Sequence, residues 1–299
     1  MTARYPSPSP NSAPWRAVCF HVSLYIQLYS AVGNPTAFCL EQHMLKELEN
    51  RALRGLMLAY LALVATGAVC AGEVNLAVAA NFTGPMQKIA ADFERATGHK
   101  ALIAYGTVGK FYAQIKSEAP FEVLVSADEE TPTRLEKDGL AVPQTRFTYA
   151  VGKLVLWSAK PGLVDDGGQV LKRADFVHLA IANPKVAVYG AAAVEAMKSL
   201  GVAAALEPRW VLGENITQAY QFVATGNAEL GFVALSQIYK NGQFAAGSHW
   251  LVPPALYPTI RQDAVLLTRG QGNPAASALL TYLKSDAARK VIRDHGYEL

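Results

Sequence analysis

The sequence predicts an α/β protein with two lobes, each a mixed, mostly parallel sheet flanked by helices. From Glu73 onward, short runs of β-branched and apolar residues alternate with amphipathic stretches, a pattern typical of strands joined by crossover helices. The apolar run at 147–159 contains no turn signal, and a second long run follows at 257–268. We interpret these two runs as strands that cross between the lobes.

The first lobe is expected to comprise residues 72–153 and 255–299. It starts with three strand-helix units, for which the predicted strands are 74–80, 100–105 and 121–127 and the predicted helices are 85–97, the segment after 106, and 130–138. In the first helix, Met86, Ile89 and Phe93 share one face, and Gly98 ends it. Two further helices within 274–294 complete the lobe.

The second lobe is expected to comprise residues 154–254. Its predicted elements are a strand in HLAIANP, a helix at 191–200, a strand in RWVLGEN, a helix at 217–225 and a strand in LGFVAL. Two crossings without a long linker favour a hinged cleft, in which a few strand residues absorb the closure of the lobes.

An export signal is predicted at residues 44–71. Lys46, Arg51 and Arg54 precede an apolar run at 56–69, and small residues follow up to Ala71. The apolar run is about 14 residues long, short of the roughly 20 that a membrane-spanning helix needs, so we expect removal rather than anchoring. Residues 1–43 are interpreted as a mis-assigned start or a disordered extension; a genuine N-terminal extension is the alternative.

The cysteines agree with export of the chain. Cys19, Cys39 and Cys70 all lie before the proposed cleavage, so the mature chain is expected to have neither disulfides nor thiol chemistry. Cys70 raises the alternative of a lipid-anchored form, but Val69 before it fits a lipoprotein cleavage site poorly.

Charge and motifs disfavour a nucleic-acid partner and an enzyme. The chain has 27 basic and 24 acidic residues and no basic block interleaved with aromatics. The histidines after residue 71 show no metal-ligand spacing, no GxSxG motif is present, and GTVGKF lacks the spacing of a phosphate loop. The acidic cluster 128–130 is interpreted as charge at a helix start, with a carboxylate acid-base pair as the second interpretation. We expect no catalysis, no cofactor and no directly bound metal ion.

Small polar residues follow the first two predicted strands. Asn81 follows the first and Thr107 the second, each just before a helix. Such positions direct backbone N–H groups and a side-chain donor toward one point. Ordinary helix capping is the alternative, because Asn and Thr are common caps.

The chain from Glu73 to Leu299 resembles the periplasmic molybdate-binding proteins. The resemblance rests on VAANFTGPMQKIAADFERATG, FEVLVSADE, RFTYAVGKLVLWSAKPGLVD, IANPKVAVYG, ELGFVAL and YLKSDAARKVIRDHGY. It implies a two-lobed type II periplasmic binding protein, with the ligand in the cleft. It also implies a receptor that acts as a monomer and delivers molybdate or tungstate to the permease and ATPase of an ABC importer.

The resemblance further implies an oxyanion held by hydroxyl, amide and backbone N–H donors of both lobes, without a basic residue. Asn81 and Thr107 match side-chain donors of the family. Val108 stands where a second Ser is common, so it offers only its backbone N–H. Tyr189 matches a ligand-binding Tyr of some members, and Ile216 matches a Val that binds through its N–H. Ala80 and Asn215 are expected to contribute less directly.

One departure from the family pattern concerns Ala234, which stands where some members supply a tyrosine hydroxyl. We therefore expect the Tyr189 hydroxyl to reach the anion instead. Val108 and Ala234 leave open a receptor of the same fold for sulfate, thiosulfate or an organic anion. Molybdate and tungstate are nearly the same size, so the sequence does not rank them.

Overall fold

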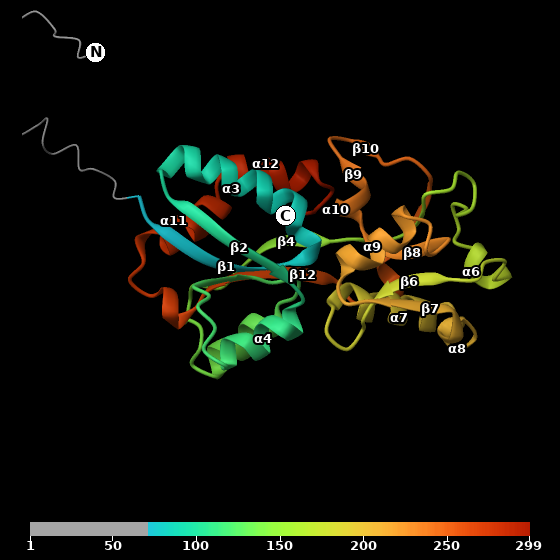
Figure 1. Ribbon diagram of the computed structural model, residues 1–299, viewed down its shortest axis with the longest axis horizontal. Coiled ribbons are helices and arrows are strands. Elements are labelled where there is room, and N and C mark those ends of the chain that lie inside the picture. Colours follow the sequence, from blue (N-terminus) through green and yellow to red (C-terminus); the bar gives the residue numbers. More distant parts are fainter. Residues whose placement is uncertain (1–70) are drawn as a thin grey trace, which may run out of the picture. The chain divides into compact units, whose positions relative to one another are not determined.

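The computed structural model describes residues 71–299, which form two five-stranded mixed sheets covered by helices (Figure 1). The predicted extension, nearly all of the predicted signal peptide and the three cysteines lie outside these residues. No helix within 71–299 is long and apolar enough to cross a membrane.

The first sheet has the strand order β2-β1-β3-β12-β4. Its strands are β1 (Glu73–Ala79), β2 (Lys100–Gly106), β3 (Val123–Val125), β4 (Phe147–Gly152) and β12 (Ile260–Leu266). β1 pairs parallel with β2 and β3, whereas β12 pairs antiparallel with β3 and β4. The β3 strand is shorter than predicted, because the chain after Ser126 turns toward the start of a helix.

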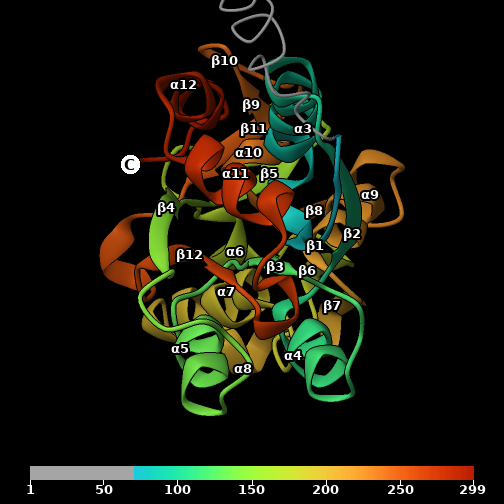
Figure 2. The ribbon, with the colours of Figure 1, turned by 90° about the vertical axis from the view of Figure 1, so that its left-hand side faces the viewer.

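Helices cover both faces of the first sheet (Figure 2). They are η1 (Ala80–Phe82), α3 (Thr83–Thr97), α4 (Val108–Lys116), α5 (Glu130–Lys137), η4 (Thr268–Gly270), α11 (Pro274–Leu283) and α12 (Asp286–Asp294). Figure 2 places α3, α11 and α12 on one face and α4 and α5 on the other. Phe82 and Phe93 are buried on the α3 face, and Phe111 and Leu135 on the opposite face.

The second sheet has the strand order β11-β5-β8-β6-β7. Its strands are β5 (Leu154–Ser158), β6 (Leu179–Ala182), β7 (Trp210–Gly213), β8 (Leu230–Ala234) and β11 (Ser248–Leu251). β6 pairs parallel with β7 and β8, and β5 pairs antiparallel with β8 and β11. The β11 strand was not predicted.

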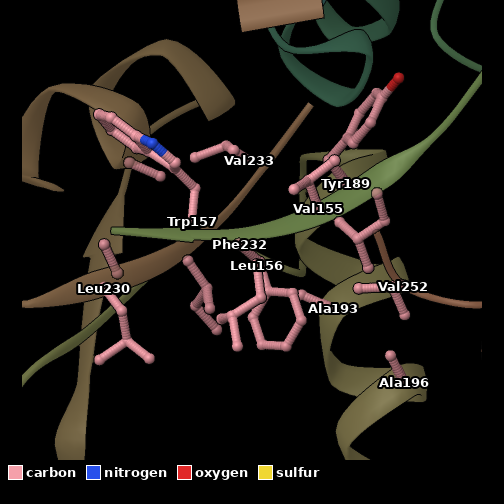
Figure 3. Close-up of a cluster of buried hydrophobic side chains, with 14 of the residues drawn as sticks. Val155, Leu156, Trp157, Tyr189, Ala193, Ala196, Leu230, Phe232, Val233 and Val252 are labelled. Atoms are coloured by element: carbon pink, nitrogen blue, oxygen red, sulfur yellow. The ribbon is translucent and has the colours of Figure 1, made fainter. Parts of the chain in front are cut away.

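The helices around the second sheet enclose a core of branched and aromatic side chains (Figure 3). The remaining elements are α6 (Val170–Arg173), α7 (Val188–Ser199), α8 (Ala203–Leu206), η2 (Glu207–Arg209), α9 (Ile216–Ala224), α10 (Leu235–Ile238), the β9 (Tyr239–Lys240) and β10 (Gln243–Phe244) hairpin, and η3 (Pro254–Leu256). Leu156 and Phe232 are fully buried at the centre of this core.

The long predicted run at 147–159 divides between the two sheets. β4 ends at Gly152 in the first sheet and β5 begins at Leu154 in the second, with Lys153 between them. The chain returns between β11 and β12. The predicted α/β class with two mixed sheets is confirmed. In both sheets, every antiparallel pair involves a strand next to one of these two crossings.

Candidate functional site

A small cavity lies where elements of the two sheets meet. Its free volume is about 20 Å³, little more than the roughly 10–15 Å³ that a single water molecule needs. Its lining residues are Ala79, Ala80, Asn81, Gly106, Thr107, Val108, Ala127, Ala187, Val188, Tyr189, Asn215 and Ile216. The cavity therefore suits a compact ion better than an extended organic molecule.

All seven residues predicted for the oxyanion site line this cavity. Ala80 and Asn81 belong to η1, which follows β1 directly. The other five lie at the first residues of three helices, two each at α4 and α9 and one at α7. Their assignment as ligand contacts stays a prediction.

The start of α4 directs one free backbone donor into the site. Thr107 is the N-cap residue, and its hydroxyl oxygen accepts from the Lys110 N–H at 3.4 Å. The Gly109 N–H donates to the Val186 carbonyl at 3.3 Å. The first helical N–H, that of Val108, has no acceptor within the helix, because none precedes it. Val108 therefore offers its N–H, and Thr107 offers its hydroxyl hydrogen.

The start of α9, which packs on the second sheet, has the same combination of a side-chain cap and a free backbone donor. Asn215 is the N-cap residue, and its side-chain oxygen accepts from the Gln218 N–H at 3.0 Å. The Ala219 N–H donates to the Asn215 carbonyl. The N–H of Ile216, the first helical residue, lies one step before these bonded groups and has no intrahelical acceptor. The capping interpretation considered for Asn81 and Thr107 thus holds for Thr107, whereas Asn81 caps neither η1 nor α3. Asn215 is a further cap, and a free backbone donor follows both Thr107 and Asn215.

The α7 helix begins without a side-chain cap. Its N-cap residue is Ala187, whose carbonyl accepts from the N–H groups of Gly190 and Ala191. The N–H groups of Val188 and Tyr189 precede these and lack intrahelical acceptors. Gly190 is required here, because a Cβ at this position would lie 2.1 Å from the Ala182 carbonyl oxygen. The close approach of α7 to β6 thereby places the helix start at the cavity.

The electrostatic character of the cavity is positive without a cationic side chain. None of its lining residues carries a charge. The N-termini of α4, α7 and α9 each contribute roughly half a positive charge from their aligned peptide dipoles. Converging helix N-termini with unpaired N–H groups form an anion site.

Behind the cavity, the Asn81 side chain joins a buried polar cluster. Its Nδ2 donates to Gln262 Oε1 at 2.8 Å and to the Tyr297 hydroxyl at 2.9 Å. Both side-chain hydrogens are therefore used inside the protein. The side-chain contact predicted for Asn81 would require the amide to release one of these bonds, whereas its backbone N–H lies in the first turn of η1 and needs no such change.

The tyrosines of this cluster remain protonated at neutral pH. Burial raises the pKa of Tyr297 to about 12. Burial likewise raises the pKa values of Tyr149 and Tyr189 well above their ordinary value, and each neighbouring tyrosine reinforces the shift. The Tyr189 hydroxyl consequently keeps the hydrogen that it would need to donate to an anion.

Hydrogen bonds around the cavity link elements beside the first sheet to elements beside the second sheet. The Thr217 hydroxyl donates to the Ala80 carbonyl at 3.2 Å, in addition to the bond between Gly109 and Val186. At the exposed rim, Lys110 Nζ lies 3.0 Å from Glu214 Oε2. The elements beside the two sheets are therefore in direct contact around the cavity.

Other residues considered from the sequence lie outside the cavity lining. Ala234 is fully buried at the end of β8. Asp128 accepts from the Thr131 N–H at 3.0 Å, as a residue at a helix start does, and burial is the main cause of its raised pKa. Within residues 71–299, no group of three or more His, Cys, Asp and Glu side chains is placed to hold a metal ion.

Sequence reasoning missed five lining residues, which are Ala79, Gly106, Ala127, Ala187 and Val188. They are small or aliphatic and carry no recognisable chemistry. Their position at strand ends and helix starts is the only sequence signal that could have identified them. Gln262 and Tyr297 behind the cavity gave no local signal at all.

The chain is similar to proteins of known function over nearly all of the described region. The family model described as bacterial extracellular solute-binding protein matches residues 74–298. The molybdate-binding protein ModA of Azotobacter vinelandii is 60% identical over 229 residues, covering 77% of this chain and 91% of that protein. ModA of Rhodobacter capsulatus is 55% identical over 228 residues, covering 76% and 88%.

A solved structure extends this similarity to the fold. The periplasmic molybdate-binding protein of Azotobacter vinelandii matches with a TM-score of 0.74 and 41% identity, covering 76% of this chain and 99% of that one. The agreement confirms the two-lobed α/β architecture that the sequence predicts.

Proposed function

The chain belongs to the family of bacterial extracellular solute-binding proteins, and we propose that it captures molybdate in the cavity between its two sheets. The observation that carries the proposal is the convergence of three helix N-termini and the Thr107 hydroxyl on a lining without charged side chains. The similarity to two molybdate-binding proteins at 60% and 55% identity supports the choice of ligand.

The donor set matches the chemistry of molybdate. Molybdate at neutral pH is a fully deprotonated dianion that only accepts hydrogen bonds, and the free groups at the cavity are N–H and O–H donors. A protonated phosphate would bring an O–H group without an acceptor, at a cost of roughly 1–3 kcal/mol. Tungstate has the same charge and nearly the same size, so we expect it to bind as well. Sulfate must be rejected by cavity size and donor spacing.

We further propose that residues 72–153 and 255–299 form one lobe, and residues 154–254 the other, with the ligand enclosed as they close. Two strand crossings with few intervening residues support a hinge at these points. The bonds between Thr217 and Ala80 and between Gly109 and Val186 are the contacts that would form on closure.

The proposed receptor works outside the cytoplasm as a monomer. It would be exported with residues 44–71 removed and would pass molybdate to the permease and ATPase of an ABC importer. The family description as extracellular and the periplasmic origin of the solved relative support this location. The donor-only cavity supports a binding role without catalysis.

Calorimetric titration of the purified protein tests the proposal. Molybdate and tungstate should each bind tightly with one ion per chain, and sulfate and phosphate should bind far more weakly. Tight binding of sulfate with none of molybdate would overturn the proposal in favour of a sulfate or thiosulfate receptor of the same fold.

A further inference from the structure

Gly109 is the second residue of α4, where the helix itself does not need a glycine. Glycine destabilises a helix relative to alanine, because it loses more backbone freedom on folding. The φ of Gly109 is not positive, so alanine could adopt the same backbone conformation. The reason for this glycine must therefore lie outside α4.

A close contact with the backbone on the opposite side of the cavity explains the glycine. A Cβ added to Gly109 would lie 3.2 Å from Val186 Cα and 3.3 Å from the Val186 carbonyl oxygen. Val186 lies between β6 and α7 and so belongs with the second sheet. The Gly109 N–H donates to the same carbonyl at 3.3 Å. The missing side chain thus allows α4 to bond to the backbone opposite it.

Thr217, the second residue of α9, makes a bond in the opposite direction. Its hydroxyl donates to the Ala80 carbonyl at 3.2 Å, and the direction of this bond is certain because a carbonyl only accepts. Ala80 lines the cavity directly after β1 of the first sheet. One bond therefore runs from the first sheet's side to the second, and the other runs back.

Each of these two bonds borders a groove beside the cavity. Gly109 and Val186 line a groove with a free volume of about 390 Å³, and Ala80 and Thr217 line another of about 400 Å³. Both grooves are far larger than the cavity, whose free volume is about 20 Å³. An anion that leaves the cavity toward either groove must separate the residues that make the bond there.

The donor of each bond directly follows a residue that is predicted to bind the anion. Gly109 follows Val108, and Thr217 follows Ile216. In both helices the N–H of the first residue has no intrahelical acceptor and is free for the anion. The second residue of each helix bonds across the cavity instead. Anion binding and contact between the two sides thus use adjacent groups.

Both bonds can open without leaving a buried group unpaired. The Ala80 carbonyl also accepts from the N–H and the hydroxyl of Thr83. Gly109 and Val186 are only partly buried and border a groove, where water can replace their bond. These properties suit contacts that form and break as two lobes move.

We propose that Gly109 and Thr217 are positioning residues that retain the anion: each closes one side of the cavity through a bond to the backbone of the opposite lobe, without touching the anion. The inference rests on the proposed function as a molybdate receptor with two closing lobes. The closed form holds the anion and the open form releases it, so weakening either bond shifts the equilibrium toward release.

Gly109→Ala should change stability and affinity in opposite directions. In the ligand-free protein the lobes can separate, and alanine should raise the melting temperature by about 1–4 °C. With the anion bound, the added methyl group holds α4 and Val186 apart, and molybdate affinity should fall by about threefold to tenfold. Thermal unfolding without ligand and calorimetric titration with molybdate measure the two effects.

Gly84→Ala is the matched control for this substitution. Gly84 is the second residue of α3, and its φ is not positive. The nearest atoms to an added Cβ lie 3.8 Å away, in the His295 side chain, which is an ordinary contact distance. This variant should give a similar rise in melting temperature and an unchanged molybdate affinity.

Thr217→Val tests the second bond, with Thr83→Val as its control. Both substitutions remove a hydroxyl that donates to the Ala80 carbonyl, at 3.2 Å from Thr217 and at 2.8 Å from Thr83. Only Thr217 comes from the opposite side of the cavity. Thr217→Val should lower molybdate affinity by about threefold to tenfold, and Thr217→Ser should restore most of it. Thr83→Val should lower the melting temperature and leave the affinity near that of the wild type.

Wild-type affinity in either Gly109→Ala or Thr217→Val, or an equal loss in the matched control, overturns the inference. A lowered melting temperature of ligand-free Gly109→Ala also overturns it, because the contact with Val186 would then be permanent and not part of closure. These results leave the proposed function intact as long as the wild type binds molybdate. Failure of the wild type to bind molybdate contradicts the proposed function instead, so the two failures are distinct.

Discussion

Adding one methyl group at Gly152 tests the packing of Tyr189 directly. A Cβ at Gly152 would lie 2.1 Å from the Tyr189 hydroxyl oxygen and 2.5 Å from Gln262 Nε2. Gly152 does not have a positive φ, so alanine can adopt its backbone conformation. The only obstacle to Gly152→Ala is therefore the space occupied by these two side chains at the end of β4.

The expected cost follows from how little the neighbours can move. Real Cβ atoms essentially never come closer than 3.0 Å to such an atom, so the hydroxyl must shift by about 1 Å. The Tyr189 ring is only 2% exposed and cannot swing aside. Overpacking of this kind costs about 1–3 kcal/mol, which for a chain of this size lowers the melting temperature by roughly 2–12 °C. The sequence analysis predicts that this hydroxyl binds the anion, so its displacement should reduce molybdate affinity roughly 10- to 150-fold.

Thermal unfolding and calorimetric titration of Gly152→Ala measure both effects. Gly167→Ala is the matched control, because a Cβ there has its nearest neighbour at 3.5 Å and the φ is not positive. The control should change neither quantity appreciably. Wild-type stability and affinity in Gly152→Ala would refute the placement of Tyr189 against β4. A loss of stability with wild-type affinity would show that the Tyr189 hydroxyl does not bind the anion.

Two further predictions concern the caps and the buried tyrosines. Thr107→Val should cost about 0.5–2 kcal/mol of stability as a lost cap and about tenfold in molybdate affinity as a lost donor. Ser285→Ala, which removes the cap of α12 far along the chain, should cost similar stability and no affinity; equal affinities in the two variants would contradict a Thr107 contact with the anion. Unfolded tyrosines ionise near pH 10, whereas burial raises the pKa of Tyr297 to about 12. Its contribution to the free energy of unfolding is therefore constant below pH 10 and falls between pH 10 and 12 by up to about 1.4 kcal/mol per pH unit. Urea denaturation over this range should give a shallower decline for Tyr297→Phe, and an unchanged decline would show that Tyr297 titrates normally.

The order of strands and helices could be predicted because it depends on local patterns. Strand β1 and helix α3 follow the predicted ranges closely, and Gly98 ends α3 with a φ of 74° as its position after the helix indicates. The β11 strand could not be predicted in this way. It is four residues long and half of it is only partly buried, so neither length nor alternation separates it from a loop. It is a strand because β5 offers it an edge.

Some residues of the candidate site could likewise be predicted from local patterns, and others could not. Asn81 and Thr107 could be located because a polar residue between a strand and a helix is a local signal, whereas the other site residues were located through the resemblance. That the three helix starts converge on one cavity depended on the resemblance to a known family. The internal use of the Asn81 amide was not anticipated, because its partners Gln262 and Tyr297 are 181 and 216 positions away in the sequence.

The sequence by itself determined which segments become strands and helices and which residues stand at the helix starts, because hydrophobic periodicity and capping act over a few residues. Only the tertiary structure decided which of those helix starts face one another and which side chains meet in the buried polar cluster. The physical reason is that these contacts join residues far apart in the sequence, here from β12, α7, η1 and the C-terminus. The packing of the two sheets brings these four segments together.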